Sequence, residues 1–226
     1  MTSIALVLCL LAGVQDDSKA KKIVKELAER SYKRTVDGKE TGRLVLKTRI
    51  EKKDRKDVVV IEDTTTIDVE GKAQETWYRQ SSALEKEFKP LGLDWKAKDG
   101  SYTGKVEGGM FLFNLKAEDG SSSFESTFIP DRTFPAPVIW RIVGSLEPKK
   151  GAKFEFSVFR PDVRKVTGGQ RLEWSGRERI NIGGNAFDTQ RWTWWNREAN
   201  HGELWVEGVL PVKARIGSED YELIRK

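Results

Sequence analysis

Hydrophobic and polar residues alternate with a period of two along most of the chain beyond residue 38. Leu44 and Leu46 alternate with charged residues, and residues 58–69 are rich in valine, isoleucine and threonine, which is typical of strands with one buried face. Glycine pairs and Asp-Gly pairs separate such segments and mark hairpin turns. The pattern predicts roughly twelve to fourteen antiparallel strands, over about 40–128 and again over about 152–225.

Two segments break this alternation and predict helices. Residues 17–32 place apolar side chains at positions i, i+3, i+4, i+7 and i+8, which predicts an amphipathic helix packed on the sheet. A proline-containing stretch at 129–137 leads into a second short helix at about 138–146. We interpret 129–150 as a crossover within one β-rich domain, which would cover 16–226. The expected fold is mainly β, an antiparallel meander rather than a series of βαβ units, and one of its expected strands covers 83–89.

The chain begins with an uncharged apolar run at residues 4–14, which ends abruptly at Gln15 and Asp16. This run is shorter than the ~20 residues of a transmembrane helix, and it suits the hydrophobic region of a secretory signal. We therefore expect a signal peptide over 1–15, an exported protein that is periplasmic or secreted, and no membrane span after signal removal. A buried N-terminal strand or helix is the alternative. Cys9 is the only cysteine, so the mature chain would contain no disulfide.

Composition narrows the possible partners. Aromatic residues make up 10% of the chain, with eight tryptophans, which argues against disorder. The formal net charge of +5 comes from residues 16–57, which hold 15 basic and 9 acidic side chains. Because nucleic-acid binders more often repeat basic residues among exposed aromatics, we expect no nucleic-acid partner. The N-terminal excess could contact anionic lipid or cell-wall polymer, although a solvated surface is the simpler interpretation.

The sequence offers little catalytic chemistry. His201 is the only histidine, and the Gly-x-Ser-x-Gly motif of a nucleophile elbow is absent, so neither a hydrolase triad nor a histidine-based zinc site is indicated. A pair of carboxylates could hydrolyse glycosides, but outward-facing positions on strands explain the same residues. We expect no enzyme, no metal and no cofactor; a carboxylate-dependent hydrolase stays as an alternative. Its candidate carboxylates are Glu173, Glu178, Asp188, Glu203 and Glu207.

Three stretches resemble the DUF3108 family of uncharacterised exported bacterial proteins. These are the segment FPAPVIWRIVGSLEPKKGAKFEFSVFRPD, the segment GELWVEGVLPVKARIGSEDYELIRK and the upstream GKETGRLVLKTRI. The resemblance covers about residues 32–226. It implies a long, strongly curved antiparallel sheet, a half-open barrel similar in kind to the lipoprotein carriers of the LolA and LolB type, which hold acyl chains. The family offers no catalytic residues to assign.

Tryptophan is the most informative residue type. Trp192 and Trp194 lie two apart and so face the same side of a strand, whereas Trp195 faces the other side. Three interpretations stay open: an apolar cavity on the concave side of the sheet, an exposed platform at Trp195 or Trp205 that stacks sugars, and plain core. For the cavity, the expected ligand-binding residues are Trp174, Trp192, Trp194, Phe154 and Phe156.

The expected function is therefore binding without catalysis. The partner would be a lipid or another apolar or amphipathic ligand, or an envelope protein, held by the curved sheet. Through Ile23, Val24 and Leu27, the N-terminal helix would close or plug that sheet. The alternative in a different class is a cell-wall or polysaccharide-binding module that uses exposed tryptophan.

Overall fold

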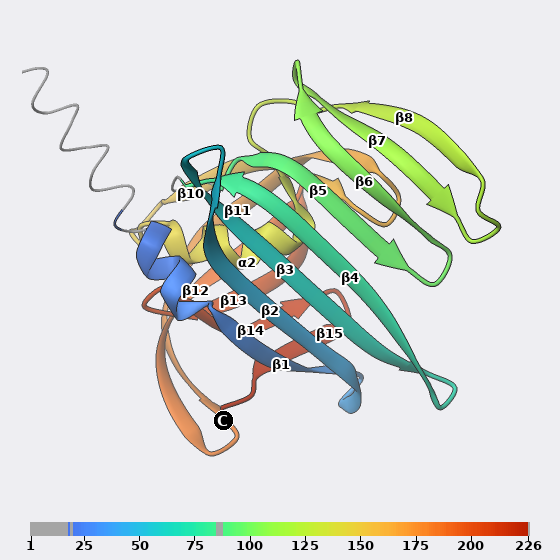
Figure 1. Cartoon of the computed structure of the whole chain (residues 1–226). Helices are drawn as coiled ribbons and strands as arrows, with labels where there is room; N and C mark the ends of the chain where they lie inside the picture. Colours follow the sequence, from blue (N-terminus) through green and yellow to red (C-terminus); the bar gives the residue numbers. More distant parts are fainter. Residues whose placement is uncertain (1–17, 19, 85–87, 226) are drawn as a thin grey trace, which may run out of the picture.

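A computed structural model describes residues 18, 20–84 and 88–225, and the predicted signal peptide lies outside these residues. Within them, one sheet of fifteen strands forms almost the whole fold (Figure 1). The strands are β1 (Glu29–Val36), β2 (Lys39–Lys53), β3 (Lys56–Val69), β4 (Lys72–Ala83), β5 (Pro90–Ala97), β6 (Gly100–Glu107), β7 (Met110–Ala117), β8 (Ser122–Phe128), β9 (Thr133–Pro135), β10 (Lys153–Arg160), β11 (Lys165–Ile182), β12 (Asn185–Asn196), β13 (Ala199–Glu207), β14 (Leu210–Ile216) and β15 (Glu219–Leu223).

The first and last strands are neighbours in the middle of this sheet. The strand order is β8-β7-β6-β5-β4-β3-β2-β1-β15-β14-β13-β12-β11-β10-β9, and only β9 pairs in parallel, with β10. We call β1–β8 the first arm and β9–β15 the second arm. The sheet curves strongly, as Figure 1 shows, and β8 and β9 stay unpaired with each other. The predicted half-open barrel is therefore confirmed.

Side chains, rather than a backbone ladder, join the far end of the first arm to the second arm. The Tyr102 hydroxyl of β6 donates a hydrogen bond to the Pro161 carbonyl at 3.0 Å. The Arg164 guanidinium donates to Glu125 of β8 at 2.8 Å, and the Phe111 and Phe159 rings lie 4.7 Å apart. These contacts bring the arms together without a backbone ladder between the edge strands β8 and β9, so the interior stays a cleft between two arms.

The hairpin turns follow from residues that tolerate positive φ. Both central residues of the β1–β2 turn, Asp37 and Gly38, have positive φ, of 51° and 76°. The β6–β7 hairpin repeats this with Gly108 and Gly109 in its turn, at 57° and 75°. Two-residue hairpins with positive φ at both positions twist with the flanking strands, which is why these short polar pairs predict the strand ends well.

Two predicted elements are wrong in their bounds. Residue 18 and residues 20–26 are helical, but the helix expected over 17–32 stops before β1, because β1 pairs with both β2 and β15 and these ladders outweigh helical periodicity. The strand expected at 83–89 is wrong for the residues that the structure describes: β4 ends at Ala83 and β5 begins at Pro90. Of the intervening residues, 85–87 lie outside the described part, and the others are not strand.

The crossover places a short helix inside the curve of the sheet. After β9 come a 3-10 turn, η1 (Ala136–Val138), and α2 (Ile139–Ser145), whose residues are all buried; this confirms the predicted mid-chain helix. The ring of Trp140 on α2 lies 4.9 Å from Tyr32 of β1 and 5.6 Å from Tyr221 of β15. Ile23, Val24 and Leu27 of the N-terminal helix belong to the same buried cluster. No helix in the described part of the chain is both long enough and apolar enough to cross a membrane.

Candidate functional site: a cavity between the two arms

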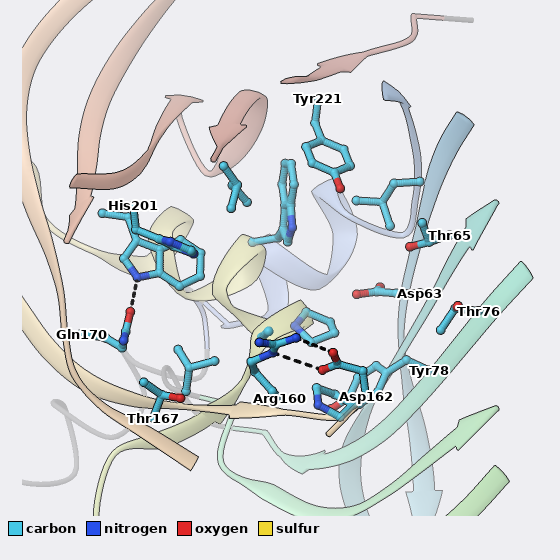
Figure 2. Close-up of a pocket in the computed structure, with 18 of the residues that line it drawn as sticks. Asp63, Thr65, Thr76, Tyr78, Arg160, Asp162, Thr167, Gln170, His201 and Tyr221 are labelled. Atoms are coloured by element: carbon cyan, nitrogen blue, oxygen red, sulfur yellow. Dashed lines mark hydrogen bonds and ion pairs between the residues drawn. The ribbon is translucent and has the colours of Figure 1, made fainter. Parts of the chain in front are cut away.

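A cavity of about 500 Å³ lies between the two arms, and Figure 2 shows the residues around it. Its volume falls in the range of small-molecule pockets. The first arm contributes side chains from β2 to β5, the second arm from β10 to β15, and the crossover contributes Ala136, Pro137 and Trp140. Both arms and the crossover thus contribute to the wall, so the cavity exists only because the sheet curves and the crossover returns through it.

The first-arm wall follows from strand register. Asp63 of β3 lies opposite Tyr78 of β4, which lies opposite Trp95 of β5. Two residue pairs further along, on the same face, Thr65 lies opposite Thr76. Because side chains alternate between the faces of a sheet, these rows all point to the concave side, where they line the cavity.

Three indole rings supply the broad apolar part of the wall, and each is fixed by a neighbouring ring. Trp95 stacks on Tyr102 with centroids 5.5 Å apart. Trp140 meets Tyr221 edge to face at 5.6 Å, and Trp194 meets His201 in the same way at 4.8 Å. Such contacts hold the rings in one orientation, so the apolar surface is present before any ligand arrives.

Gln170 connects two lining residues of the second arm. Its Oε1 accepts a hydrogen bond from Trp194 Nε1 at 2.8 Å, and its Nε2 donates to Asn196 Oδ1 at 2.9 Å. Gln170 is only 4% exposed, which makes these bonds costly to lose. These two hydrogen bonds fix the plane of the Trp194 indole, which lines the cavity.

Charged groups occur at two places in the wall. At the base, the Asp63 carboxylate accepts hydrogen bonds from Arg141 of α2 at 2.6 and 2.8 Å. Burial raises the pKa of Asp63, and the adjacent guanidinium opposes that rise. At the mouth, Arg160 donates to both carboxylate oxygens of Asp162, at 2.5 and 3.3 Å; these two side chains are half exposed.

His201 lies beside the mouth, half buried against Trp194. Burial and then the positive charge of Arg160 lower the pKa of His201 below its usual value. The imidazole is therefore neutral near pH 7. Among the described residues it forms no hydrogen bond with a carboxylate, so the arrangement of a catalytic triad is not present there.

The five residues predicted to bind ligand all lie along the second arm. Across β11 and β12, Trp174 is paired with Trp192, and Leu172 with Trp194. Trp194 lines the cavity, and Phe156 packs against it at 6.0 Å. Trp192 is 2% exposed. Phe154 packs on Phe134 at 6.0 Å, and Trp174 donates to Gln190 at 3.0 Å; neither lines the cavity wall. Ligand binding by the five residues stays a prediction.

Sequence reasoning missed the lining residues of the first arm and the crossover. Asp63 had a readable signal, because the alternation of β3 places it on the same face as Val59 and Ile61, both fully buried. A carboxylate at such a position needs a partner. Arg141 had a weaker signal: it is the one charged residue in the apolar segment of α2, IWRIVGS. Nothing in the local sequence shows that the two meet.

Burial does not favour the exposed-tryptophan interpretation. All eight tryptophans lie within the described residues, and each is buried or half buried. Trp205 is 6% exposed, and its indole nitrogen donates to Glu178 at 3.0 Å. Trp195 is half buried, with Arg171 over its ring at 5.6 Å. Burial and the neighbouring charged side chains therefore speak against a sugar-stacking platform at these two rings, and sugar binding stays an untested alternative.

The carboxylates proposed for a hydrolase lie away from the cavity, and each pairs with a basic side chain. Glu178 and Glu203 both lie within 4 Å of Arg191. Glu173 lies within 4 Å of Lys153 and of Arg171. Asp188 lies within 4 Å of Arg179, and Glu207 within 4 Å of Arg225. None of the five lines the cavity wall. These five carboxylates therefore form no acid–base pair at this cavity.

Comparison with known proteins supports the fold. The chain is similar to the crystal structure of a beta-barrel-like protein of the domain of unknown function DUF1849 from Brucella abortus, with a TM-score of 0.51 and 8% sequence identity. The match covers 87% of this chain and 95% of that one. No protein-family model and no curated protein matches the sequence, so the DUF3108 resemblance is not confirmed. At this identity the likeness shows a shared barrel-like fold alone.

Proposed function

We propose that the protein is an exported binding protein that holds an amphipathic small molecule between the arms of its sheet and performs no chemistry on it. The observation that carries this proposal is the cavity of about 500 Å³, walled by three fixed indole rings and by a set of polar side chains. Pockets that bind small molecules combine a mostly apolar wall with a few placed polar groups.

The wall presents both apolar and polar surface. Val158 and Ile216 add apolar surface to the three tryptophans, and Thr65, Thr76 and Thr167 present hydroxyl groups. A purely apolar ligand would leave the hydroxyl groups without water or another hydrogen-bond partner. A purely polar ligand would bury no apolar surface against the indole rings and would gain no hydrophobic stabilisation there. An amphipathic ligand satisfies both.

Export rests on the sequence. The apolar run at residues 4–14 and the polar break after it support removal of a signal peptide, and the resemblance to the exported DUF3108 proteins points the same way. The test is cell fractionation of the full chain with a C-terminal tag. We expect a shortened mature form outside the cytoplasm, and we expect Leu10→Arg to leave the uncut chain inside. An uncut, intracellular wild-type chain would contradict export.

Binding is tested with the neutral fluorescent probe N-phenyl-1-naphthylamine. Thr65 and Thr66 are adjacent on β3 and face opposite sides of the sheet, and only Thr65 lines the cavity. We expect Thr65→Phe to weaken probe binding by about tenfold or more, because the ring fills part of the cavity, which corresponds to ~1.4 kcal/mol. Thr66→Phe is the matched control and should bind as wild type does. Equal affinity in both variants would place the probe elsewhere, and no binding by the wild type would contradict a ligand cavity.

A further inference from the structure

The charges of the cavity wall are already neutralised by the protein itself. Three carboxylate or guanidinium groups line it, on Asp63, Arg160 and Asp162. Asp63 accepts both of its short hydrogen bonds from Arg141, and Arg160 is paired with Asp162. Each positive charge at the wall therefore has a negative partner within hydrogen-bond distance.

A pocket built for an ion differs from this one. A carboxylate or phosphate inside a low-dielectric cavity needs an unpaired arginine or lysine, and an ammonium needs an unpaired carboxylate, because burial of an uncompensated ion is costly. Among the described residues of the wall, Arg160 is the one arginine or lysine, and its Nε and Nη2 already donate to Asp162. A charged ligand would therefore have to compete with the ion-pair partner that Arg160 or Asp162 already has.

The polar groups that are free to bind are uncharged. Thr65 and Thr76 are a cross-strand pair on the first arm, and Thr167 lies on the second arm. These three residues line the cavity, and in the described part of the chain no hydrogen bond engages their hydroxyl groups. Figure 2 shows Thr65 and Thr76 at one side of the cavity and Thr167 at the other. Hydroxyl groups donate and accept, so they suit ester, ether or hydroxyl oxygens.

We infer that the ligand of this cavity is an uncharged amphipath: a neutral lipid-like molecule whose hydroxyl or ester oxygens meet the threonines while its hydrocarbon lies on the tryptophans. This inference rests on the proposed function and names the chemical class of its ligand. The neutral state of His201 agrees with it, since the lowered pKa of that imidazole keeps a positive charge out of the wall near pH 7.

The test is a competition series with one chain length and three head groups. 1-Monolauroylglycerol, laurate and dodecyltrimethylammonium share a twelve-carbon chain and differ in charge. Each compound is titrated against the complex of the full chain with the fluorescent probe, and displacement of the probe is measured. The pH is about 8, where laurate is ionised and an imidazole is neutral. We expect the glyceride to displace the probe at a concentration at least about tenfold lower than either ion, the equivalent of ~1.4 kcal/mol.

Two matched variants test whether the mouth pair sets this preference. Asp162→Asn leaves Arg160 without its anion, and Arg160→Gln leaves Asp162 without its cation; both side chains are half exposed, so the fold should tolerate either change. We expect Asp162→Asn to improve laurate binding and Arg160→Gln to improve binding of dodecyltrimethylammonium, each by about threefold, which is the strength of a partly exposed ion pair. Glyceride binding should change little in both.

The outcomes separate the two levels of the proposal. An uncharged ligand is supported if the wild type prefers the glyceride, if Asp162→Asn improves laurate binding and if Arg160→Gln improves binding of dodecyltrimethylammonium. Laurate or the ammonium ion binding as tightly as the glyceride would overturn the neutral class and leave the cavity as a binding site. Probe binding that none of the three compounds displaces would also overturn the lipid-like class. Absence of probe binding by the wild type would overturn the proposed function itself.

Discussion

The guanidinium of Arg141 and the carboxylate of Asp63 face each other in the core, joined by hydrogen bonds of 2.6 and 2.8 Å, although one residue lies on α2 and the other on β3. The side chains are 0% and 5% exposed. Arg141 also donates to the Thr48 hydroxyl at 3.2 Å and to the carbonyls of Lys47 and Pro137. This one side chain therefore ties the crossover helix to the first arm and holds Asp63, which lines the cavity.

Removing the Asp63 charge should strongly destabilise the protein. In Asp63→Asn, Arg141 stays buried and charged but loses its anionic partner, and such a loss typically costs about 3–5 kcal/mol. The free energy of unfolding, from urea denaturation of wild type and variant, measures it. Asp57→Asn is a control on the exposed start of the same strand and should change stability by less than about 0.5 kcal/mol. A fully stable Asp63→Asn would show that the carboxylate does not hold Arg141.

The close approach of α2 to the β13–β14 turn predicts an unusual effect of alanine. Alanine favours helices over glycine by about 1 kcal/mol, yet a Cβ at Gly144 would lie 2.2 Å from the Val209 carbonyl oxygen. We expect Gly144→Ala to lower the melting temperature by several degrees, because backbone atoms cannot yield as a flexible side chain does. At Gly168 the nearest atom to an added Cβ is 3.7 Å away, so Gly168→Ala should melt close to wild type. A stabilised Gly144→Ala would mean that α2 can shift.

Trp192 and Trp194 should separate stability from binding. Trp192 is buried and lies off the cavity wall, whereas Trp194 is buried and lines it. Trp192→Ala should cost about 3–5 kcal/mol of stability. Trp194→Phe keeps an aromatic ring but loses the hydrogen bond to Gln170, so we expect about 1–2 kcal/mol of lost stability and weaker binding of the probe. Urea denaturation and probe titration measure the two effects. Unchanged probe affinity in Trp194→Phe would remove this ring from the binding surface.

The local sequence pattern was sufficient to predict most of the hairpins, but it was insufficient to predict β1, which lies in the middle of the sheet. Period-two alternation and positive-φ turn pairs act between neighbours in sequence, so hairpins such as β2–β3 and β6–β7 could be predicted. β1 could not, because residues 29–32 continue a helical pattern and become strand only through pairing with β2 and, from Tyr32 onward, also with β15 at the other end of the chain. Long-range pairing overrides local propensity in this way.

The cavity shows the same division. The face shared by Trp192 and Trp194 could be read from their spacing, but which part of that face borders empty space depends on where α2 lies. Trp140 of α2 reaches the cavity wall, and Arg141 beside it holds Asp63. These positions follow from contacts between segments distant in sequence, which no single-strand pattern contains.

His201 should make the protein less stable as the pH falls below neutral. Its pKa in the folded protein is lowered by burial and by Arg160, whereas in the unfolded chain it is about 6.5. As pH falls through about 6.5, the unfolded chain takes up the proton first, so the free energy of unfolding decreases until the pH is below the folded pKa. Above about pH 7.5 both states are neutral, and this contribution to stability is fully present. Urea denaturation of wild type and His201→Gln across this range isolates the effect. The variant loses the contact with Trp194 at every pH, which lowers its free energy of unfolding by a constant amount. On acidification the free energy of unfolding of the wild type should fall more than that of the variant. A wild type that instead gains stability on acidification would require an anionic partner for His201 and would reverse the assigned direction of its pKa shift.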